Sequence, residues 1–314
     1  MNGLFENKTV LVTGATGSFG NTVVPELLRR GAKRVVAYSR GEEKQWRMRR
    51  KLPDSRLHFV IGDVRDFERV LDAANDADYV YHAAALKFVP TCEDAPSEAY
   101  KTNITGSLNV REACRQTGVA KAILVSTDKA VKPINAYGMS KAMAEKLWLQ
   151  DELRTDTLFG VVRYGNVLGS RGSIIPLYRE LILEDKPLPI TDTRMNRFFL
   201  TLDQAIGLVI YATEHMRGGE VFIPNNPAFL ITDLALAMAG PDYPIDDVGI
   251  RPGEKISEVL ISEEETHRAE DRGERFVIHP IGTPQSGIEQ EFTSINARQL
   301  SVDEIKAVIS DAAL

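Results

Sequence analysis

Cysteine is scarce in this sequence. Only two cysteines, Cys92 and Cys114, occur among its 314 residues. Two thiols at this spacing provide neither a disulfide framework nor a metal-binding motif. The five histidines are scattered, so no metal site is expected. This composition is typical of a protein from a reducing compartment, and we expect a cytoplasmic location.

Long apolar runs and basic runs are also missing. No stretch approaches the roughly 18 apolar residues that span a bilayer. The first residues, MNGLFENKTV, lack the pattern of a signal peptide. The formal net charge is −6, which disfavours nucleic acid and anionic membrane surfaces as partners. A phosphorylated small molecule is still compatible with this charge, because local Arg, Lys and backbone N–H groups are sufficient to bind it.

Short apolar runs alternate with helix-length segments in the first half of the chain. The runs are continuous and rich in Val and Ile, as strands buried on both faces must be. The expected strands are residues 9–13, 34–38, 57–61, 79–83, 122–126 and 158–164. The expected helices include residues 18–30, 97–117 and 137–154. This alternation predicts an α/β fold with a doubly wound, parallel Rossmann sheet.

The pattern loosens after about residue 166, where prolines divide the chain into short pieces. Four helices are expected here, at residues 173–186, 201–216, 231–239 and 301–312. We therefore predict a Rossmann domain over residues 1–165 and a smaller C-terminal α/β substrate lobe over residues 166–314. The boundary is soft, because chains of this type can cross between lobes.

A glycine-rich loop, TGATGSFG, follows the first strand directly and opens a helix. Its three glycines allow a tight turn and let backbone N–H groups approach a pyrophosphate at the positive end of the helix. A glycine triplet alone is also compatible with an ordinary strand–helix turn. Its position after the first of six strands favours dinucleotide binding. The predicted contacts from this loop are Gly14, Thr16, Gly17, Ser18, Phe19 and Gly20.

The residues after the second strand favour NADP over NAD. An NAD enzyme usually places an acid there for the ribose 2′-hydroxyl. This chain instead reads YSRGEEK, with Ser39, Arg40 and Lys44. A guanidinium suits a 2′-phosphate, which an acid would repel. The alternative is that Arg40 is a solvated loop charge.

Further cofactor contacts are expected after the later strands. Asp63 follows the third strand, where it could accept a hydrogen bond from the adenine amine. The segment HAAALK follows the fourth strand, and its alanines let the loop pass close to a cofactor. The predicted contacts from these and following segments are Asp63, Val64, Ala83, Ala84, Ala85, Lys87, Asn103 and Val167.

Tyr137 and Lys141 are four residues apart and therefore share a helix face. A free tyrosine has a pKa near 10. A nearby ammonium and a positive nicotinamide ring favour its phenolate, which can take the proton of a sugar hydroxyl. Thr127, or alternatively Ser126, can hold that hydroxyl at the end of the fifth strand. The pair also counts among the predicted cofactor contacts.

These features resemble those of the extended short-chain dehydrogenase/reductase superfamily. Within it, the sequence is similar to the soluble UDP-N-acetylglucosamine 4,6-dehydratases, of the inverting pseudaminic-acid type or the capsule-sugar type. The matching segments, between residues 13 and 261, are TGATGSFG, HAAALKFVP, KTNITGSLNV, STDKAVKPINAYGMSK, RYGNVLGSRGSIIP, ITDTRMNRFFLT and IRPGEKISEVLI. The glycine loop marks only the superfamily, whereas the Asp128-Lys129 pair is specific. Tyr137 stands where the membrane-linked, retaining relatives and some capsule-sugar relatives carry Met, and its presence favours inversion at C5.

The resemblance implies transient oxidation at C4 of the sugar, loss of water across C5 and C6, and return of the hydride to C6. It assigns Lys129 as the C5 base and Asp128 as the partner that handles the C6 proton. Thr127, Tyr137 and Lys141 would serve the oxidation. A base must be partly neutral, so we expect Lys141, NADP⁺ or burial to lower the pKa of Lys129. The alternative is that Asp128 and Lys129 form a solvated turn.

The resemblance also implies a UDP-sugar substrate and a homo-oligomer, either a dimer or a hexamer. Arg197 and Arg251 suit a diphosphate, although each alone could be a surface charge. The implied substrate contacts are Lys87, Asn166, Arg171, Ser173, Arg197, Arg251 and Glu254. Two other functions stay open. A UDP-sugar 4-epimerase needs only the Tyr, Lys and Thr set, and a non-catalytic NADP-binding sensor has no use for it.

Overall fold

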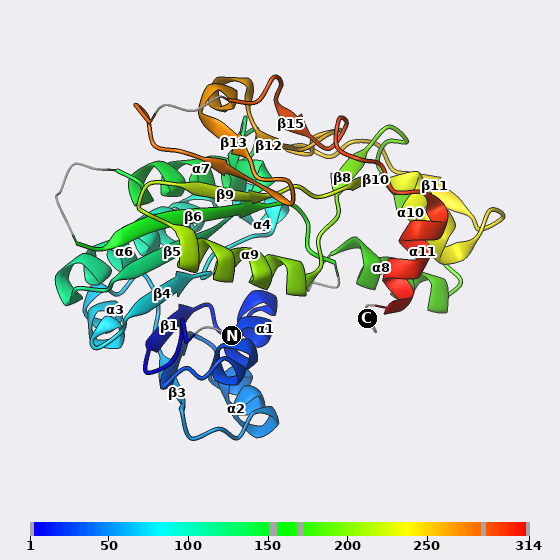
Figure 1. Cartoon of the computed structure of the whole chain (residues 1–314). Helices are drawn as coiled ribbons and strands as arrows, with labels where there is room; N and C mark the ends of the chain where they lie inside the picture. The colour runs from blue at the N-terminus through cyan, green and yellow to red at the C-terminus, as the bar shows by residue number, and fades with distance from the viewer. Residues whose placement is uncertain (1–2, 151–155, 169–172, 284–286, 312–314) are drawn as a thin grey trace.

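A nine-stranded sheet forms the centre of the protein (Figure 1). The computed structural model describes residues 3–150, 156–168, 173–283 and 287–311. The strand order is β13-β14-β9-β6-β5-β4-β1-β2-β3, and the strands from β9 to β3 run parallel. The strands are β1 (Thr9–Thr13), β2 (Arg34–Ser39), β3 (Leu57–Ile61), β4 (Tyr79–His82), β5 (Lys121–Thr127), β6 (Leu158–Tyr164), β9 (Val221–Pro224), β13 (Ala269–Asp271) and β14 (Arg275–Ile278).

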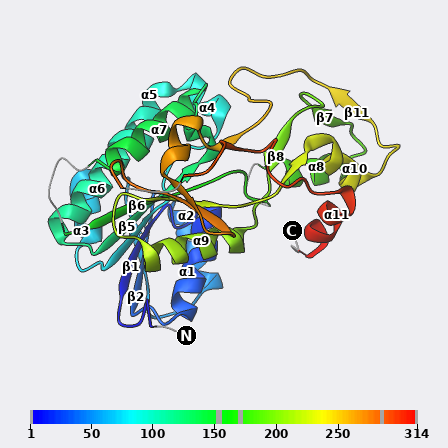
Figure 2. The ribbon, with the colours of Figure 1, turned by 45° about the horizontal axis from the view of Figure 1, so that its top comes forward.

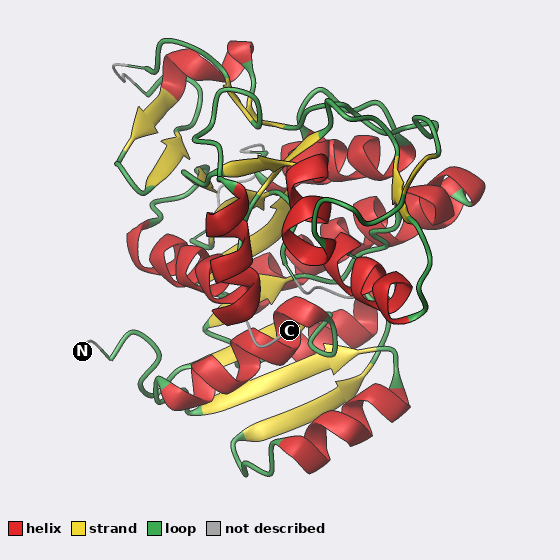
Figure 3. Ribbon diagram, turned by 90° about the vertical axis from the view of Figure 1, so that its right-hand side faces the viewer, coloured by secondary structure: helices red, strands yellow, loops and turns green. Residues whose placement is uncertain are grey.

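The six strands expected in the first half are all present, and the predicted doubly wound Rossmann sheet is confirmed. Successive residues of each strand face opposite sides, so Leu11 and Val12 enter different hydrophobic cores. Helices flank the strands in Figure 3. One face packs against α1 (Ser18–Arg29), α2 (Glu42–Lys51) and α9 (Leu202–His215), and the other against α3 (Phe67–Ala74), α6 (Gly106–Thr117) and α7 (Ala136–Trp148).

The second half of the chain contributes to the central sheet as well as to a separate lobe. Strand β9 runs parallel to β6, and β14 and β13 extend the sheet in antiparallel fashion. Helix α9 begins at a capping box, in which the Thr201 hydroxyl and the Gln204 side chain each bond the other's backbone N–H. The chain therefore returns to the larger sheet after residue 166.

The C-terminal lobe lies beside the carboxyl ends of the parallel strands (Figure 2). It has its own apolar core, which includes Tyr178, Leu234 and Ile305. The helices expected in this half are present as α8 (Ile174–Leu183), α9, α10 (Ile231–Ala239) and α11 (Val302–Asp311). Three small sheets pair β7 (Leu188–Ile190) with β11 (Ile245–Asp247), β8 (Asn196–Phe198) with β10 (Ala228–Leu230), and β12 (Val259–Ile261) with β15 (Phe292–Thr293).

The helix expected at residues 97–117 is divided into three parts. The α5 helix (Pro96–Ala99) leads into a π-helical turn, η1 (Tyr100–Thr105), and then into α6. A π turn shifts the side chains that follow it and often occurs at functional sites. Here it contains Asn103, which is buried. The remaining helical segments are α4 (Val89–Asp94) and the short 3₁₀ helices η2 (Asp128–Ala130) and η3 (Glu263–Arg268).

Candidate active site

The glycine loop brings the ends of β1 and β4 into close contact. Gly14 has a φ of +67°, and a Cβ there would lie 2.8 Å from the backbone of Ala83. A Cβ on Gly20 would lie 2.2 Å from the carbonyl oxygen of Ala15, so α1 packs tightly on the loop. Gly17 is the N-cap of α1, and no side chain caps this helix end. A helix N-terminus without a side-chain cap and the close backbone approach fit a dinucleotide pyrophosphate.

The other predicted loop residues surround this helix end. Thr16 is buried, and its carbonyl accepts a hydrogen bond from Asn21 Nδ2 at 2.9 Å. Ser18 and Phe19 are the first two residues of α1, and Phe19 packs partly into the core beneath the helix. The structure thus brings the six predicted loop residues together at one helix N-terminus.

Cations surround Asp63 at the ends of β2 and β3. Arg65 Nη2 lies 2.7 Å and Arg40 Nη1 3.6 Å from Asp63 Oδ2. Burial raises the pKa of the Asp63 carboxyl, but the bonds from Arg65 and the charge of Arg40 outweigh this, and the pKa is lowered. Ser39 is buried and accepts a hydrogen bond from Gln45. Lys44 is exposed in the first turn of α2, the helix that follows β2.

Asn103 fixes the loop that follows β4. Its Oδ1 accepts from the Leu86 N–H at 2.8 Å, and its Nδ2 donates to the Leu86 carbonyl at 2.9 Å and to Ser140 Oγ at 2.9 Å. All of these bonds go to protein groups, so Asn103 shapes the predicted cofactor loop. Along that loop Ala83, Ala84 and Ala85 are partly buried.

Three further predicted cofactor contacts lie after β4, β3 and β6, respectively. Lys87 is exposed, with Nζ 5.4 Å from the centre of the Phe88 ring. Val64 is buried, and a Cβ on Gly106 would lie 2.6 Å from it. Val167 forms a β-bridge with Leu200 in the C-terminal half.

Thr127 and Tyr137 meet at the carboxyl end of β5. A hydrogen bond with Thr127 and the charge of Lys129 act to lower the pKa of Tyr137, but burial has the larger effect and raises it to about 12. Thr127 Oγ1 donates to Asp128 Oδ1 at 2.9 Å. The neighbouring Ser126 faces the other side of the sheet, where its hydroxyl bonds Glu145. Of the two hydroxyls left open by the sequence, Thr127 is the one beside Tyr137.

Lys141 is buried one helical turn beyond Tyr137, with 3% of its surface exposed. Its Nζ donates to the Val125 carbonyl at 2.8 Å. Burial lowers the pKa of Lys141 to about 8, and the charge of Glu145 opposes part of that change. Glu145 is held by Arg163 at 2.6 Å, and Arg163 is also paired with Glu265 at 2.9 Å. A buried ion-pair network therefore fixes α7 from behind.

Lys129 lies among oxygen atoms. Its Nζ is 3.0 Å from Asp128 Oδ1, 3.1 Å from Glu258 Oε1 and 3.3 Å from Asn166 Oδ1. Burial opposes the charge of this amine, but Asp128 and Glu258 together outweigh burial, and the pKa of Lys129 is raised. The expected lowering is therefore wrong, because a second carboxylate lies against the amine. The pair is also not a solvated turn, since Asp128 has 0% of its surface exposed.

Glu258 is the main residue that sequence reasoning missed. It lies in the segment IRPGEKISEVLI, just before β12, and only 1% of its surface is exposed. Arg197 Nε and Lys255 Nζ each lie 3.9 Å from one of its carboxylate oxygens. The signal that could have found it is an acid inside an apolar run, because an acid in such a position is almost never buried without a partner.

The predicted substrate contacts divide into two groups. Asn166 touches Lys129, and Arg197 is buried with its guanidinium bonded to the carbonyls of Asn196, Lys255 and Ile256. The Arg197 guanidinium therefore donates hydrogen bonds to the protein backbone. Arg171 lies outside the described residues.

The other predicted substrate contacts lie at the edges of the site. The Arg251 side chain is 58% exposed, and its Nη1 lies 4.0 Å from Glu254 Oε1. Ser173 is the N-cap of α8, and its hydroxyl is buried with no hydrogen-bond partner among the described residues. The turn that carries Arg251 and Glu254 is attached to the start of α7, because Asn135 Nδ2 donates to the Gly253 carbonyl at 2.7 Å.

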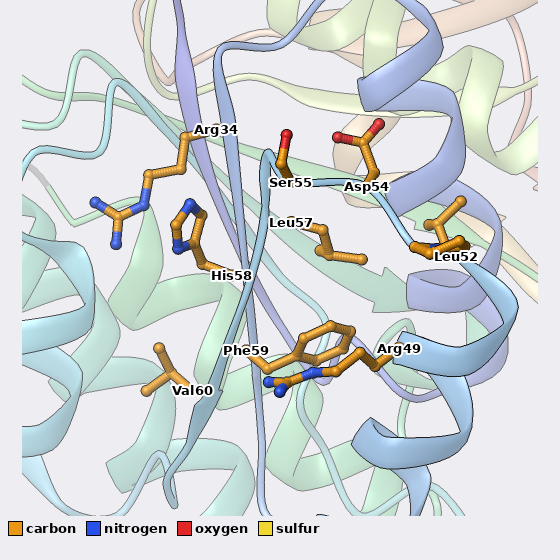
Figure 4. A pocket seen from close by; sticks show the side chains of 10 residues that line it. Arg34, Arg49, Leu52, Asp54, Ser55, Leu57, His58, Phe59 and Val60 are labelled. Atoms are coloured by element: carbon orange, nitrogen blue, oxygen red, sulfur yellow. The ribbon is translucent and has the colours of Figure 1, made fainter.

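The hollows of the described structure include one at the predicted site and one along an edge strand. One is narrow and lies between the lobes, lined by Asn166, Val167, Leu168, Ser173, Ile174, Ile175, Arg197, Phe198 and Phe229. The other follows the edge strand β3 (Figure 4), where Arg49 stacks over Phe59 at 4.9 Å. Only the first hollow contains predicted site residues, so it extends the candidate active site.

Two further observations concern the described residues alone. None of their helices has the length and apolar character needed to cross a membrane. They contain no cluster of three or more His, Cys, Asp or Glu side chains placed to hold a metal ion.

Comparison with known proteins identifies the family. A family model for polysaccharide biosynthesis proteins matches residues 10–280. A UDP-glucose 4-epimerase of Rickettsia bellii is 43% identical, over 98% of this chain and 96% of its own. A UDP-N-acetylglucosamine 4,6-dehydratase (inverting) of Campylobacter jejuni is 45% identical, over 88% of this chain and 84% of its own.

A solved structure agrees with the chain over nearly its whole length. Pen from Bacillus thuringiensis is 35% identical and has a TM-score of 0.92, covering 98% of this chain and 99% of that one. The match includes both the central sheet and the C-terminal lobe. The chain therefore belongs to the polysaccharide biosynthesis protein family, a branch of the extended short-chain dehydrogenases/reductases that modify nucleotide sugars.

Proposed function

We propose that the protein is a UDP-N-acetylglucosamine 4,6-dehydratase, a hydro-lyase that yields a UDP-4-keto-6-deoxy-N-acetylhexosamine with inversion at C5. The observation that carries this proposal is the position of Lys129. Its Nζ lies 3.0 Å from Asp128, and Asp128 accepts a hydrogen bond from Thr127 at 2.9 Å. A carboxylic acid, Asp128, and an amine, Lys129, therefore lie beside the Thr127–Tyr137 pair. Epimerisation at C4 needs only that pair and Lys141, whereas elimination of water also needs an acid and a base.

The cofactor in this proposal is NADP, with NAD as the alternative. Gly14, Gly17 and Gly20 support pyrophosphate binding through their close backbone packing. Arg40, whose side chain is 53% exposed beside Asp63, is available for a 2′-phosphate, and Lys44 is nearby in sequence. When bound, the nicotinamide supplies a hydride acceptor for C4 and a donor for C6, and its positive ring favours the Tyr137 phenolate.

The residues of the chain perform the proton transfers. Tyr137 takes the proton of the C4 hydroxyl, which Thr127 orients. The C4 ketone makes the C5 proton acidic, and Lys129 removes it. The proton that Tyr137 has taken passes through the Thr127 hydroxyl to Asp128, which accepts a hydrogen bond from Thr127 at 2.9 Å. Asp128 then gives that proton to the C6 hydroxyl, which leaves as water, and Tyr137 is again a phenolate. Lys141 supports the phenolate from the same helix face, and Glu145 and Arg163 hold that helix in place.

The runner-up is a UDP-sugar 4-epimerase, which the similarity to the Rickettsia enzyme supports at almost the same identity. The buried Lys129, Asp128 and Glu258 cluster argues against it, because an epimerase would keep three desolvated charges beside its site without a use for them. A non-catalytic NADP-binding sensor is the third reading. It would have no need of the Tyr137, Lys141 and Thr127 set.

The test is incubation of the purified protein with UDP-N-acetylglucosamine and NADP, followed by mass spectrometry. The dehydratase yields a product lighter by one water. An epimerase returns an isomer that keeps its 6-hydroxyl, and a sensor leaves the sugar unchanged. Either of these two outcomes would overturn the proposal.

The organisation of the molecule is part of the same proposal. Residues 1–165 would hold the cofactor and residues 166–314 the UDP-sugar, with the active site where the two parts meet. We expect a homo-oligomer, either a dimer or a hexamer. Light scattering of the purified protein distinguishes these states from a monomer.

A further inference from the structure

Lys129 has an acceptor for each proton of its ammonium group. The three oxygens belong to Asp128, Glu258 and Asn166, at 3.0, 3.1 and 3.3 Å. These acceptors come from η2, from the residue before β12 and from the loop after β6. Such a site holds a charged amine firmly. A C5 base, however, must have a free lone pair, so the proton has to leave Nζ before the reaction starts.

The carboxylates around Lys129 are sheltered from water. The side chains of Lys129, Asp128 and Glu258 are 20%, 1% and 2% exposed. In such surroundings a charged pair loses much of its advantage over the neutral amine and carboxylic acid, because both ions lack hydration. Transfer of a proton within the pair is therefore accessible without solvent.

Glu258 is better suited than Asp128 to receive that proton. Asp128 Oδ1 already accepts the Thr127 hydroxyl at 2.9 Å, which stabilises its charged form. Glu258 Oε1 contacts Lys129 at 3.1 Å. Glu258 Oε2 and Asp128 Oδ2 are both buried with no hydrogen-bond partner among the described residues, so the two acids differ in the Thr127 hydroxyl that supports Asp128. A carboxylate without such a donor gains more from protonation than one whose charge is supported.

The backbone around Glu258 is fixed in place. Its N–H donates to Ser294 Oγ at 2.8 Å, and the Ser294 N–H donates to the Glu258 carbonyl at 2.9 Å. The Ser294 hydroxyl also bonds Asn196. Two segments of the C-terminal half thus hold the carboxylate against Lys129.

We propose that Glu258 is a positioning residue that accepts the proton of Lys129 and so makes Lys129 available as the C5 base. In this step an N–H bond of Nζ breaks and an O–H bond forms on Glu258. The neutral amine then takes the C5 proton, and the C5–H electron pair passes to the enolate of the C4 ketone. The proton returns from Glu258 when Lys129 has given its own proton back to C5. This inference rests on the proposed dehydratase function.

Several charges face this pair and set its proton balance. Asp128 stabilises the ammonium of Lys129, while Arg197 opposes it, and the phenol of Tyr137 is close enough to interact with it. Glu258 itself is approached by Arg197 and Lys255, each at 3.9 Å. These groups are unchanged by a substitution at Glu258, so its effect can be attributed to the carboxyl group.

The test is the rate at which deuterium from D₂O enters C5 of the sugar, measured against pH in Glu258→Gln and Glu258→Asp. Gln cannot take a proton, so Lys129 must lose its own to solvent. In Glu258→Gln we expect deuterium to enter C5 at least about tenfold more slowly than in wild type at neutral pH. The rate in this variant should rise by up to about tenfold per pH unit. Wild type and Glu258→Asp keep a carboxyl group and should show a nearly flat profile. Reduction of the bound cofactor by substrate should persist in all three proteins.

The matched control is Glu291→Gln, which removes a carboxylate from the neighbouring Lys132, 2.5 Å away and half-exposed. Its exchange profile should stay flat. If deuterium enters C5 equally slowly in both Glu258 variants, at a rate that does not change with pH, then Glu258 is only structural and the inference is overturned. If wild type neither exchanges C5 nor loses water, the proposed function itself has failed, and that outcome is distinct.

Discussion

The two halves of the candidate active site are built differently. One half, proposed to serve hydride transfer and called the hydride half, consists of Thr127, Tyr137 and Lys141, which lie on β5 and α7 within one short stretch of chain. The other, proposed to serve elimination and called the elimination half, gathers Lys129 with Asn166, Arg197 and Glu258, which come from distant segments. A local motif thus supports the first half, and contacts between segments far apart in the sequence create the second.

The different surroundings in the two halves change the pKa values of their lysines, Lys141 and Lys129, in opposite ways. Lys141 is buried and donates to a backbone carbonyl, and burial lowers its pKa to about 8. Lys129 lies between two carboxylates, and its pKa rises. Two amines near the end of the same strand are therefore adjusted in opposite directions by their neighbours.

The largest expected effect separates the halves at the hydride step. Tyr137→Phe removes the hydroxyl that takes the C4 proton, so hydride transfer should fall by about 10²–10⁴-fold. The protein should still fold and bind the cofactor, because the ring that packs at the site is kept. Single-turnover absorbance of the reduced cofactor gives the rate. Near-normal turnover would mean that another group takes that proton.

The hydride half could be read from the sequence because its spacing is local. The Rossmann strands, the glycine loop and the Tyr137–Lys141 pair follow from short-range patterns, and the structure places them as expected. The choice between Ser126 and Thr127 needed the structure, since it depends on which side of β5 each residue faces. Glu258 and the donors of Arg197 depend on contacts between segments far apart in the sequence, which no short sequence pattern encodes.

A smaller effect is expected on cofactor binding, on which both halves of the site depend. Arg40→Asp replaces with an acid the guanidinium whose Nη1 lies 3.6 Å from Asp63 Oδ2. Loss of a charge-assisted bond should weaken NADP binding by about 1.5–3 kcal/mol and leave NAD binding much less affected. Titration with both dinucleotides measures the difference. Tighter binding of NAD than NADP by wild type would contradict the cofactor assignment.

A stability effect of similar or smaller size is expected in the glycine loop. Gly20→Ala places a methyl group 2.2 Å from the backbone of Ala15, so α1 must shift. Overpacking of this kind costs about 1–3 kcal/mol of unfolding free energy. Gly207→Ala is the control, because a Cβ there meets nothing within 4 Å. Denaturant unfolding of both variants checks this, and equal stabilities would contradict the packing argument.

The smallest expected effect is a difference between Lys141 and Lys129 in how each makes the free energy of unfolding depend on pH. The pKa of Lys141 falls from its ordinary 10.5 to about 8 on folding, so the unfolded chain binds more protons between these values. Its contribution to stability is complete above 10.5 and is lost as the pH falls through 8, by at most about 1.4 kcal/mol per pH unit. Lys129 has a raised pKa, so its contribution is constant below 10.5.

Denaturant unfolding of substituted proteins at pH values between about 8.5 and 9.5 measures how the free energy of unfolding changes with pH. Lys141→Met should remove the rise in stability with pH that wild type shows. Lys129→Met should keep that rise. Equal slopes in the two variants would show that the environments of the lysines do not differ as described.

The most direct test of the account is Lys129→Ala incubated with UDP-N-acetylglucosamine in D₂O. Because Tyr137 and Lys141 are intact, the variant should still oxidise C4 and accumulate reduced cofactor. It should then stop at a 4-keto sugar that keeps its 6-hydroxyl and carries no deuterium at C5. Wild type should lose water and place deuterium at C5 of the inverted product. Full water loss by Lys129→Ala, or a wild-type product without deuterium at C5, would contradict the assignment of Lys129 as the base of a dehydratase.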